Sequence, residues 1–353
     1  PVTVDPTFQT ESYIKASNTE AGDWFGFSVS IYGDTMVVGA RSDDSSATGI
    51  DGDQFDNNAS AAGAVYVYVR DADGWEQQAY VKASNAEGGD YFGYAVDIYE
   101  NTLVVGAPGE DSAAHQVDGD QFSNSSENSG AAYVFVRETA DTWRQEAYLK
   151  PSENRQKAGF GRSVALSGGV VVVGAPGNES AFVFRRTESN WVQEGLLRAS
   201  SGADGDEFGC AVDISGDTLV IGAYLEDSAA RVVNGNQQDD SATDSGAAYV
   251  FQRSGNWYQQ AYLKAENADP KDHFGYSVSI SGDSIIVGAP WEDSFSNGVN
   301  GNDGNPDPSI HPPEYDPPRK LPLFVETHAD RVRIRQAKSV QRYRKPDLHF
   351  FFS

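Results

Sequence analysis

Four long polar segments of the chain repeat one set of oxygen-bearing side chains. In each set the first residue is followed by others seven, nine and twelve positions later, and a glycine separates the middle two. The sets are Asp44, Asp51, Asp53, Asp56; Asp111, Asp118, Asp120, Ser123; Asp227, Asn234, Asn236, Asp239; and Asp293, Asn300, Asn302, Asn305. Calcium takes about six to eight oxygen ligands, and a glycine lets a loop turn tightly around them. The spacing therefore predicts Ca²⁺ binding, first in the two sets richest in aspartate.

A second interpretation of these segments stays open, in which no metal takes part. Asn, Asp and Ser side chains accept hydrogen bonds from backbone amides a few residues on, and such turns can order a polar surface loop. The closing bidentate Glu of an EF-hand loop is missing from the sets, so they do not match that calcium motif. Loops longer than about 15 residues are usually ordered by something, here either cations or internal hydrogen bonds.

The polar segments belong to a unit that occurs five times. A Phe-Gly pair is followed by a Gly-Ala pair fourteen residues after the Phe, and an aromatic residue stands seventeen residues before it. The Phe-Gly pairs are Phe25-Gly26, Phe92-Gly93, Phe160-Gly161, Phe208-Gly209 and Phe274-Gly275, and the aromatic residues are Phe8, Trp75, Trp143, Trp191 and Trp257. Spacing this constant indicates one structural unit in several copies, with these residues as its scaffold. In the third copy the polar segment is cut short.

Each unit predicts four short antiparallel strands. In the second copy, residues 94–99 alternate in polarity, a two-residue turn follows, and residues 102–106 are almost wholly apolar. A third strand is expected at 132–137 and a fourth from Trp143. Four-stranded units repeated without helices are typical of β-propeller blades. The sequence therefore predicts an all-β protein, a propeller of about five blades.

Both ends of the chain depart from the repeat. Residues 8–16 match a fourth strand without the preceding three, and the last copy loses the pattern after its second strand. We therefore expect the N-terminal strand to complete the last blade and close the ring. The repeat domain spans residues 1–304, and residues 305–353 form a Pro-rich, then basic tail. Three interpretations of the tail stay open: a docking tail, a shifted reading frame, or a divergent third strand at Leu321–Glu326 or Arg331–Gln336.

The charge is divided unevenly along the chain. The formal net charge is -26, and residues 309–353 contain nine Lys/Arg and five Asp/Glu, so the tail carries +4 and the remainder -30. A body this acidic should repel nucleic acid and anionic membranes, so we expect no nucleic acid among the partners. No apolar run approaches the roughly 18 residues of a membrane span. The sequence leaves the oligomeric state undecided.

The repeat resembles the FG-GAP repeat of the integrin α-subunit propeller, and most closely the bacterial FG-GAP repeat proteins. The proline of the motif is present as Pro108, Pro176 and Pro290, with Arg41 and Tyr224 in the other copies. The resemblance covers about residues 8–304 and implies a β-propeller that binds ligands outside the cell or at its surface. Propellers of this family commonly have seven blades, so a truncated seven-bladed ring stays open.

The resemblance does not supply a calcium site. In integrin propellers the calcium loop lies between the first and second strands, where this chain has two-residue turns such as Gly33-Asp34. Calcium must therefore be argued from the polar segments alone.

A few single residues also recur or stand apart. Asp23, Asp90, Asp206 and Asp272 precede their Phe by two positions, and we expect them to pair with the Lys that ends each fourth strand or to cap a turn. Cys210 is the only cysteine and is interpreted as a packed small residue. Tyr66, Tyr68, Tyr133 and Tyr249 are interpreted as aromatics that pack the blades.

No catalytic motif is found in the sequence: GxSxG, HExxH and a phosphate-binding glycine loop are all missing. The leading hypothesis is a non-catalytic, extracellular or cell-surface adhesion module that recognises a protein or glycan through the polar segments, with calcium as a stabilising ion. Two alternatives stay open: an enzyme that acts on polysaccharides, and a structural component of a surface layer. The fold cannot decide, because propellers perform both binding and catalysis.

Overall fold

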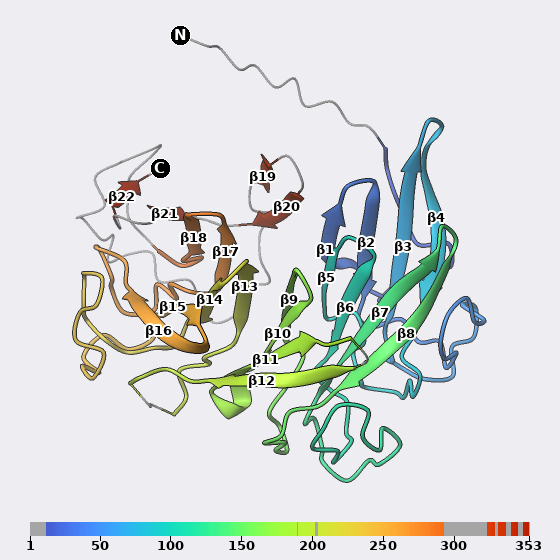
Figure 1. Ribbon diagram of the computed structural model, residues 1–353, viewed down its shortest axis with the longest axis horizontal. Helices are drawn as coiled ribbons and strands as arrows, with labels where there is room; N and C mark the ends of the chain where they lie inside the picture. The colour runs from blue at the N-terminus through green and yellow to red at the C-terminus, as the bar shows by residue number, and fades with distance from the viewer. Residues whose placement is uncertain are drawn as a thin grey trace.

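The computed structural model describes residues 12–188, 190–201 and 204–292, together with the backbone of four strands near the C-terminus. Five antiparallel sheets fan around a common centre (Figure 1). The predicted all-β propeller of about five blades is confirmed, and the described helical structure is a single 3-10 turn, η1 (Pro176–Asn178). No helix among the described residues has the length and apolarity to cross a membrane.

Within each of the first four blades the strands follow the order of the sequence, and the first strand is innermost. The blades are β1 (Phe25–Tyr32), β2 (Thr35–Ala40), β3 (Ala64–Asp71), β4 (Gly74–Val81); β5 (Ala95–Tyr99), β6 (Thr102–Ala107), β7 (Ala131–Thr139), β8 (Thr142–Leu149); β9 (Ser163–Ser167), β10 (Val170–Ala175), β11 (Ser180–Arg186), β12 (Trp191–Leu197); and β13 (Ala211–Ser215), β14 (Thr218–Ala223), β15 (Ala247–Ser254), β16 (Asn256–Leu263). Successive innermost strands contact one another from β1 through β5, β9 and β13 to β17 (Ser277–Ser281).

The last blade is completed differently from our expectation. Its sheet runs β17, β18 (Ser284–Gly288), β21 (Val340–Arg344) and β22 (His349–Phe352), so the tail supplies the third and fourth strands. Residues 12–16 form no strand, and residues 8–11 lie outside the described residues.

The two tail segments expected as the third strand lie elsewhere. The segment Arg331–Gln336 is strand β20, which pairs with β1, and β19 (Leu323–His328) pairs with β20. An edge strand offers backbone hydrogen-bonding groups to a partner, so any extended segment can pair with it. The sequence pattern therefore did not distinguish β19 and β20 from β21 as the partner of β18.

The glycines of the repeat form the contact between blades. A Cβ on Gly106 would stand 1.9 Å from the carbonyl oxygen of Gly161, and one on Gly174 would stand 1.9 Å from that of Gly209. Gly161 and Gly209 have φ angles of 96° and 97°, in the left-handed region that favours glycine. The Gly-Ala and Phe-Gly pairs are therefore two sides of one backbone contact between neighbouring blades.

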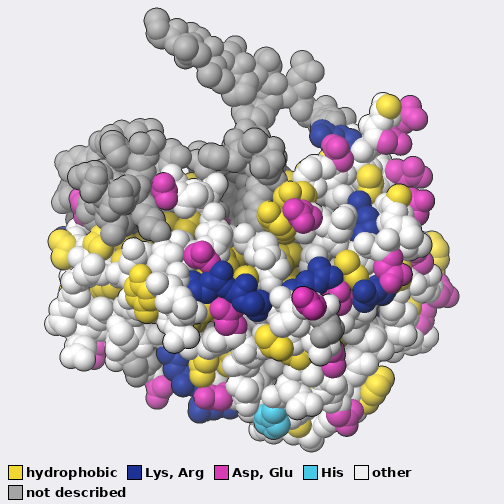
Figure 2. Space-filling view, viewed as in Figure 1, with side chains coloured by type: hydrophobic (Ala, Val, Ile, Leu, Met, Phe, Trp, Pro, Cys, Tyr) yellow, Lys and Arg dark blue, Asp and Glu magenta, His cyan; other side chains and the backbone are white. Residues whose placement is uncertain are grey.

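The tryptophans of the fourth strands also join neighbouring blades. Trp143 Nε1 donates to Gln78 Oε1 of the preceding blade at 2.9 Å, and Trp191 Nε1 donates to Glu146 Oε2 at 2.9 Å. An arginine from the third strand lies over the tryptophan ring in four blades, with pairs Arg70–Trp75, Arg137–Trp143, Arg186–Trp191 and Arg253–Trp257. Figure 2 shows Lys and Arg side chains gathered in a band across one face, between Asp and Glu.

Candidate functional site

The polar segments are inserts between the second and third strands of a blade. They occupy residues 41–63, 108–130 and 224–246, and in the third blade only η1 connects the strands. Each insert ends on the next blade: the amide of Phe92 donates to Ala62 O at 3.0 Å, and that of Phe160 donates to Ser129 O at 3.0 Å. The inserts therefore stand at the end of the ring where the Phe-Gly pairs lie.

Each predicted ligand that the structure describes in the first two positions of a set binds a distant backbone amide. The first residue accepts from the amide seventeen residues later, at 2.6–2.7 Å, in Asp44–Ala61, Asp111–Asn128 and Asp227–Asp244. The second residue accepts from an amide of the fourth strand of the same blade, at 2.8–2.9 Å, in Asp51–Tyr80, Asp118–Tyr148 and Asn234–Tyr262.

The remaining members of the sets form local turns. The side-chain oxygen accepts from the amide two residues on in Asp53–Phe55, Asp120–Phe122, Asn236–Gln238, Asp56–Asn58 and Asp239–Ser241. Ser123 shares a hydrogen bond with the hydroxyl of Ser125 instead. Asp and Asn side chains accept hydrogen bonds from corresponding amides in different blades, because a carboxylate and an amide oxygen are both acceptors.

The hydrogen bonds of the predicted ligands bear on the calcium prediction. Among the described residues, no group of three or more His, Cys, Asp and Glu side chains is placed to hold a metal ion. Every member of the three described sets except Ser123 accepts a hydrogen bond from a backbone amide, and the fourth set, Asp293, Asn300, Asn302 and Asn305, lies outside the described residues. Calcium binding by the inserts stays a prediction.

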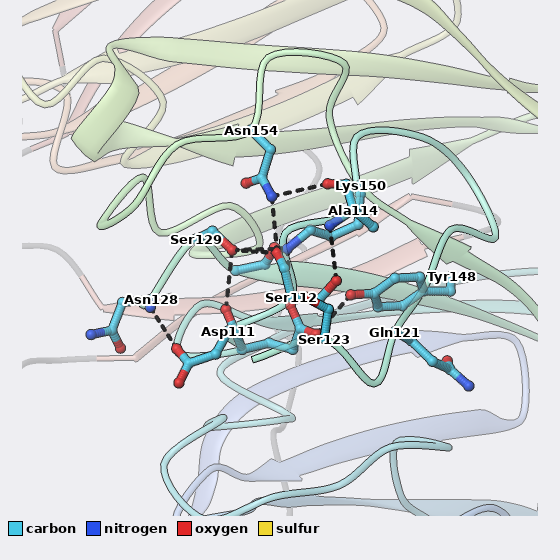
Figure 3. A network of polar contacts seen from close by, with 12 residues as sticks. Asp111, Ser112, Ala114, Gln121, Ser123, Asn128, Ser129, Tyr148, Lys150 and Asn154 are labelled. Atoms are coloured by element: carbon cyan, nitrogen blue, oxygen red, sulfur yellow. Dashed lines mark hydrogen bonds and ion pairs between the residues drawn. The ribbon is translucent and has the colours of Figure 1, made fainter. Parts of the chain in front are cut away.

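A buried ion pair anchors each of the three described inserts at its base. Figure 3 shows the polar contacts around Lys150, Tyr148 and Ser129 of the second blade. In the second blade Lys150 Nζ lies 2.9 Å from Glu110 Oε2 and also donates to Ser129 Oγ at 2.9 Å. The hydroxyl of Tyr148 donates to the other oxygen of Glu110 at 2.7 Å. Burial lowers the pKa of Lys150, against the pull of Glu110. A charged pair in the core is tolerated only when each partner is satisfied in this way.

An acid, a lysine and a tyrosine occupy the same positions in the first and fourth blades, which also have a long insert. Lys264 pairs with Glu226 at 2.8 Å, and Lys82 pairs with Asp43 at 3.2 Å. The third blade lacks the long insert and has neither group: Asn178 stands in place of the acid, and an exposed Arg198 stands in place of the lysine. The buried pair therefore accompanies the insert and not the blade.

Three of the four aspartates that precede a Phe cap a turn, one of the two roles expected for them. Asp90 Oδ2 accepts from the amide of Glu87 at 2.9 Å, and Asp272 and Asp23 accept from the corresponding amides. Burial raises the pKa of Asp90 to about 7, against the hydrogen bond from Glu87, and raises that of Asp206 to about 7 as well.

Glu179 replaces the missing insert of the third blade. Its carboxylate accepts from the amide of Phe208 at 2.8 Å and from those of Gly205 and Glu207 at 3.1 Å each. The corresponding amides of Phe92, Phe160 and Phe274 donate to a backbone carbonyl of the insert. One side chain thus satisfies the amides that a long loop satisfies elsewhere.

A cluster of four aromatic rings surrounds Arg41 at the insert end of the first two blades; we call it the arginine cage. The Arg41 guanidinium carbon lies 4.4 Å from the ring centre of Phe27, 5.0 Å from Trp24, 5.6 Å from Tyr94 and 5.7 Å from Tyr91. Cation–π contacts of this kind are favourable within about 6 Å. The cage is built from positions beside the Phe-Gly and Gly-Ala pairs.

Corresponding positions of the last two blades hold a second aromatic cluster. Tyr224 stands where the first blade has Arg41, and its ring centre lies 5.2 Å from His273 and 5.3 Å from Tyr276. The His273 ring lies 4.1 Å from that of Trp291. Burial lowers the pKa of His273 to about 4, so this imidazole is neutral at physiological pH.

Sequence reasoning missed the acids at the base of the inserts and the aromatic clusters. One signal was available for the acids, since Asp43, Glu110, Glu226 and Glu292 each stand three residues after the Ala of a Gly-Ala pair. No sequence signal joined Arg41 to Tyr94, because the contact exists only where two blades meet. The lone Cys210 is packed as expected, with Sγ 3.6 Å from Gly275 O, and burial raises its pKa to about 12.

Comparison with known proteins identifies the repeat. No curated protein matches the chain. A family model described as FG-GAP repeat matches residues 8–68, 75–135, 143–184, 191–251 and 257–304, well over half of the chain. Such repeats in a propeller suggest a domain of the binding or adhesion type. With five matched repeats that coincide with the repeat unit of the sequence, the chain belongs to the FG-GAP repeat family.

Proposed function

We propose that this propeller is a non-catalytic binding module that acts outside the cell or at its surface. The insert end of the ring recognises a protein or glycan. The observation that carries this proposal is the location of the three described inserts, which stand at one end of the blades and are tied to the neighbouring blade by hydrogen bonds such as Phe92 N to Ala62 O. Loops held by a rigid scaffold are the usual place of binding residues.

The third blade provides a design for removing one insert without unfolding the blade. Residues 108–130 are replaced by the connection Pro176–Glu179, and Lys150 is changed to Arg to match Arg198. The Glu of the transplanted connection supplies an acceptor for the amide of Phe160, as Glu179 does for Phe208. This variant keeps the buried lysine from losing its partner, which would otherwise destabilise the protein.

The test is a binding screen of the natural chain and of this variant against a glycan array and a panel of extracellular-matrix proteins. We expect at least one ligand to bind the natural chain and to bind the variant at least tenfold more weakly, with melting temperatures that stay close. Undiminished binding by the variant would show that this insert takes no part. Binding of no ligand in either panel would contradict the proposed function.

The two alternative functions can be tested with the same two proteins, because each predicts a different measurable result. A polysaccharide-active enzyme would release new reducing ends from polysaccharides, and a surface-layer component would assemble into sheets visible by electron microscopy. Binding without either result supports the module, whereas turnover of a polysaccharide would replace it with the enzyme.

A further inference from the structure

Two arginines at the insert end have guanidinium groups without an acidic partner. Neither Arg41 nor Arg162 has a carboxylate oxygen within 4.0 Å among the described residues, although arginines such as Arg70, Arg186 and Arg253 each do. Nε of Arg41 is buried and has no hydrogen-bond partner there. Carboxylates are abundant in a chain with a net charge of -26. Guanidinium groups that have no carboxylate partner therefore have N–H donors available for an acceptor on a ligand.

Both guanidinium groups lie beside the ring of the same tyrosine. Arg41 and Arg162 both lie over the ring of Tyr94, with distances of 5.6 Å and 5.9 Å to its centre. Because the N–H donors of a guanidinium point outward in its plane, a ring that lies over its face does not occupy them. Such a planar fork matches a carboxylate in two parallel hydrogen bonds.

Exposed rings flank these donors. Trp24 of the arginine cage is 59% exposed, and Phe27 beside it is 39% exposed. The backbone of Trp24 and that of Tyr91 are in the left-handed region, with φ of 58° and 57°, which is costly for residues other than glycine and persists only where packing imposes it. Flat apolar faces held out toward solvent suit the apolar faces of a sugar ring.

A hollow of 380 Å³ adjoins the cage at Arg41, and neither Trp24 nor Arg162 is among its lining residues. It is lined by Arg41 and Tyr91 and also by the acidic residues Glu20, Asp23 and Asp44. Its volume lies in the range of small-molecule sites. A ligand that fills it must present an anion to the arginine, donors to the carboxylates, and an apolar face to the ring. A sugar with a carboxylate meets these demands through its acid, its hydroxyls and its ring face.

We propose that the arginine cage, with Arg162, binds a uronic-acid-containing saccharide. This inference rests on the proposed binding function and names its ligand class and its residues. The carboxylate of the saccharide takes the free donors of Arg41 and Arg162, and the sugar ring lies on Trp24. An acidic peptide fits less well, because its carboxylate side chains bring neither a sugar ring face for Trp24 nor hydroxyl donors for Glu20, Asp23 and Asp44.

The test compares a trigalacturonide with its methyl ester by titration calorimetry, using the full chain and four variants. Arg41→Met, Arg162→Met and Trp24→Ala change the proposed site. Arg144→Met is the control, because Arg144 lies on the fourth strand of the second blade, outside the cage, and pairs with Glu138 of the third strand. We expect the acid to bind at least tenfold more tightly than the ester. Each site variant should lose at least tenfold in affinity for the acid, and the control should stay within about twofold.

Several results would overturn the inference. These are equal affinity for acid and ester, an unchanged affinity in Arg41→Met, no binding of either saccharide, or tighter binding of an oligoglutamate peptide. Melting temperatures of all variants show whether a loss of affinity reflects unfolding. If the ligand from the insert screen still binds Arg41→Met with full affinity while the saccharides do not bind, this inference fails and the proposed function stands.

Discussion

Lys150 and Glu110 form an ion pair of 2.9 Å whose two side chains are almost wholly buried, at 0% and 2% exposed. They lie forty residues apart in the chain, Glu110 in the first residues of the long insert of the second blade and Lys150 directly after the fourth strand. The pair joins the beginning of the insert to the end of the fourth strand, and Ser129 near the end of the insert hydrogen-bonds the same ammonium group. One lysine therefore closes the loop at its base.

Loss of this acid should be costly. Glu110→Ala leaves Lys150 buried without a partner, and we expect the free energy of unfolding to fall by about 3–5 kcal/mol in urea denaturation. Glu138→Ala removes the exposed pair with Arg144 and should cost less than about 1 kcal/mol. Replacing Glu110 and Lys150 together by Met should restore much of the loss. Equal small effects of both single changes would show that the buried pair does not anchor the insert.

The close approach of the glycines predicts a difference between two alanine substitutions. Gly106→Ala forces a methyl group against the carbonyl of Gly161, and we expect a loss of about 3 kcal/mol or more, since backbone must move. Gly33 has open space around it but a φ of 55°, so Gly33→Ala should cost about 1–2 kcal/mol. Chemical denaturation of both variants measures the difference, and a Gly106→Ala protein as stable as Gly33→Ala would contradict the contact.

In the third blade, the carboxylate of Glu179 takes the place of the long insert as hydrogen-bond acceptor, and this can be tested by substitution. Glu179→Ala removes the acceptor of three backbone amides, and we expect a loss of about 2–3 kcal/mol. Glu179→Gln retains one acceptor oxygen and should lose less. The exposed Glu188 gives a control, because its change to Ala should leave the unfolding midpoint within experimental error. Hydrogen exchange at the Phe208 amide should quicken in Glu179→Ala alone, and protection retained there would rule out this role.

Asp90 predicts a stability that falls as the pH rises. Burial raises its pKa in the folded state to about 7, above the roughly 3.9 of an unfolded chain. The folded state thus binds the proton more tightly, so its contribution is full below pH 4 and is lost as the pH rises through 7. Asp90→Asn should flatten the stability profile between pH 4 and 8 and raise stability at pH 8. Urea denaturation across this range measures it, with exposed Asp283 changed to Asn as control; an unaltered profile would refute the assignment.

The hydrogen bonds of the inserts give a test of the calcium prediction. Asp51 and Asn234 accept the same amide in their blades, so Asp51→Asn should leave the melting temperature unchanged, while Asp51→Ala lowers stability by about 1–2 kcal/mol. Chelator should then have little effect on either protein. A rise in melting temperature with calcium that disappears in Asp51→Asn would instead establish a metal ligand, because only binding to the folded state stabilises it.

The architecture was available from the sequence because it depends on short-range spacing. Alternation along residues 94–99, the turn after them and the return of Phe-Gly in every copy are properties of adjacent residues, and they predicted the strands of the blades. The completion of the last blade was not available, since β18 accepts any backbone partner and the tail supplies β21.

The contacts of the candidate site residues could not be predicted from the sequence, because they form only in the folded chain. The sequence alone determined which oxygens recur in the inserts, but not their partners, because Asp51 meets the amide of Tyr80 only after the insert folds onto the fourth strand. Likewise Arg41 meets Tyr94 only where two blades pack. The repeat is fixed by the order of residues along the chain. The hydrogen-bond partner of Asp51 and the rings around Arg41 are instead fixed by distances between residues far apart in the chain.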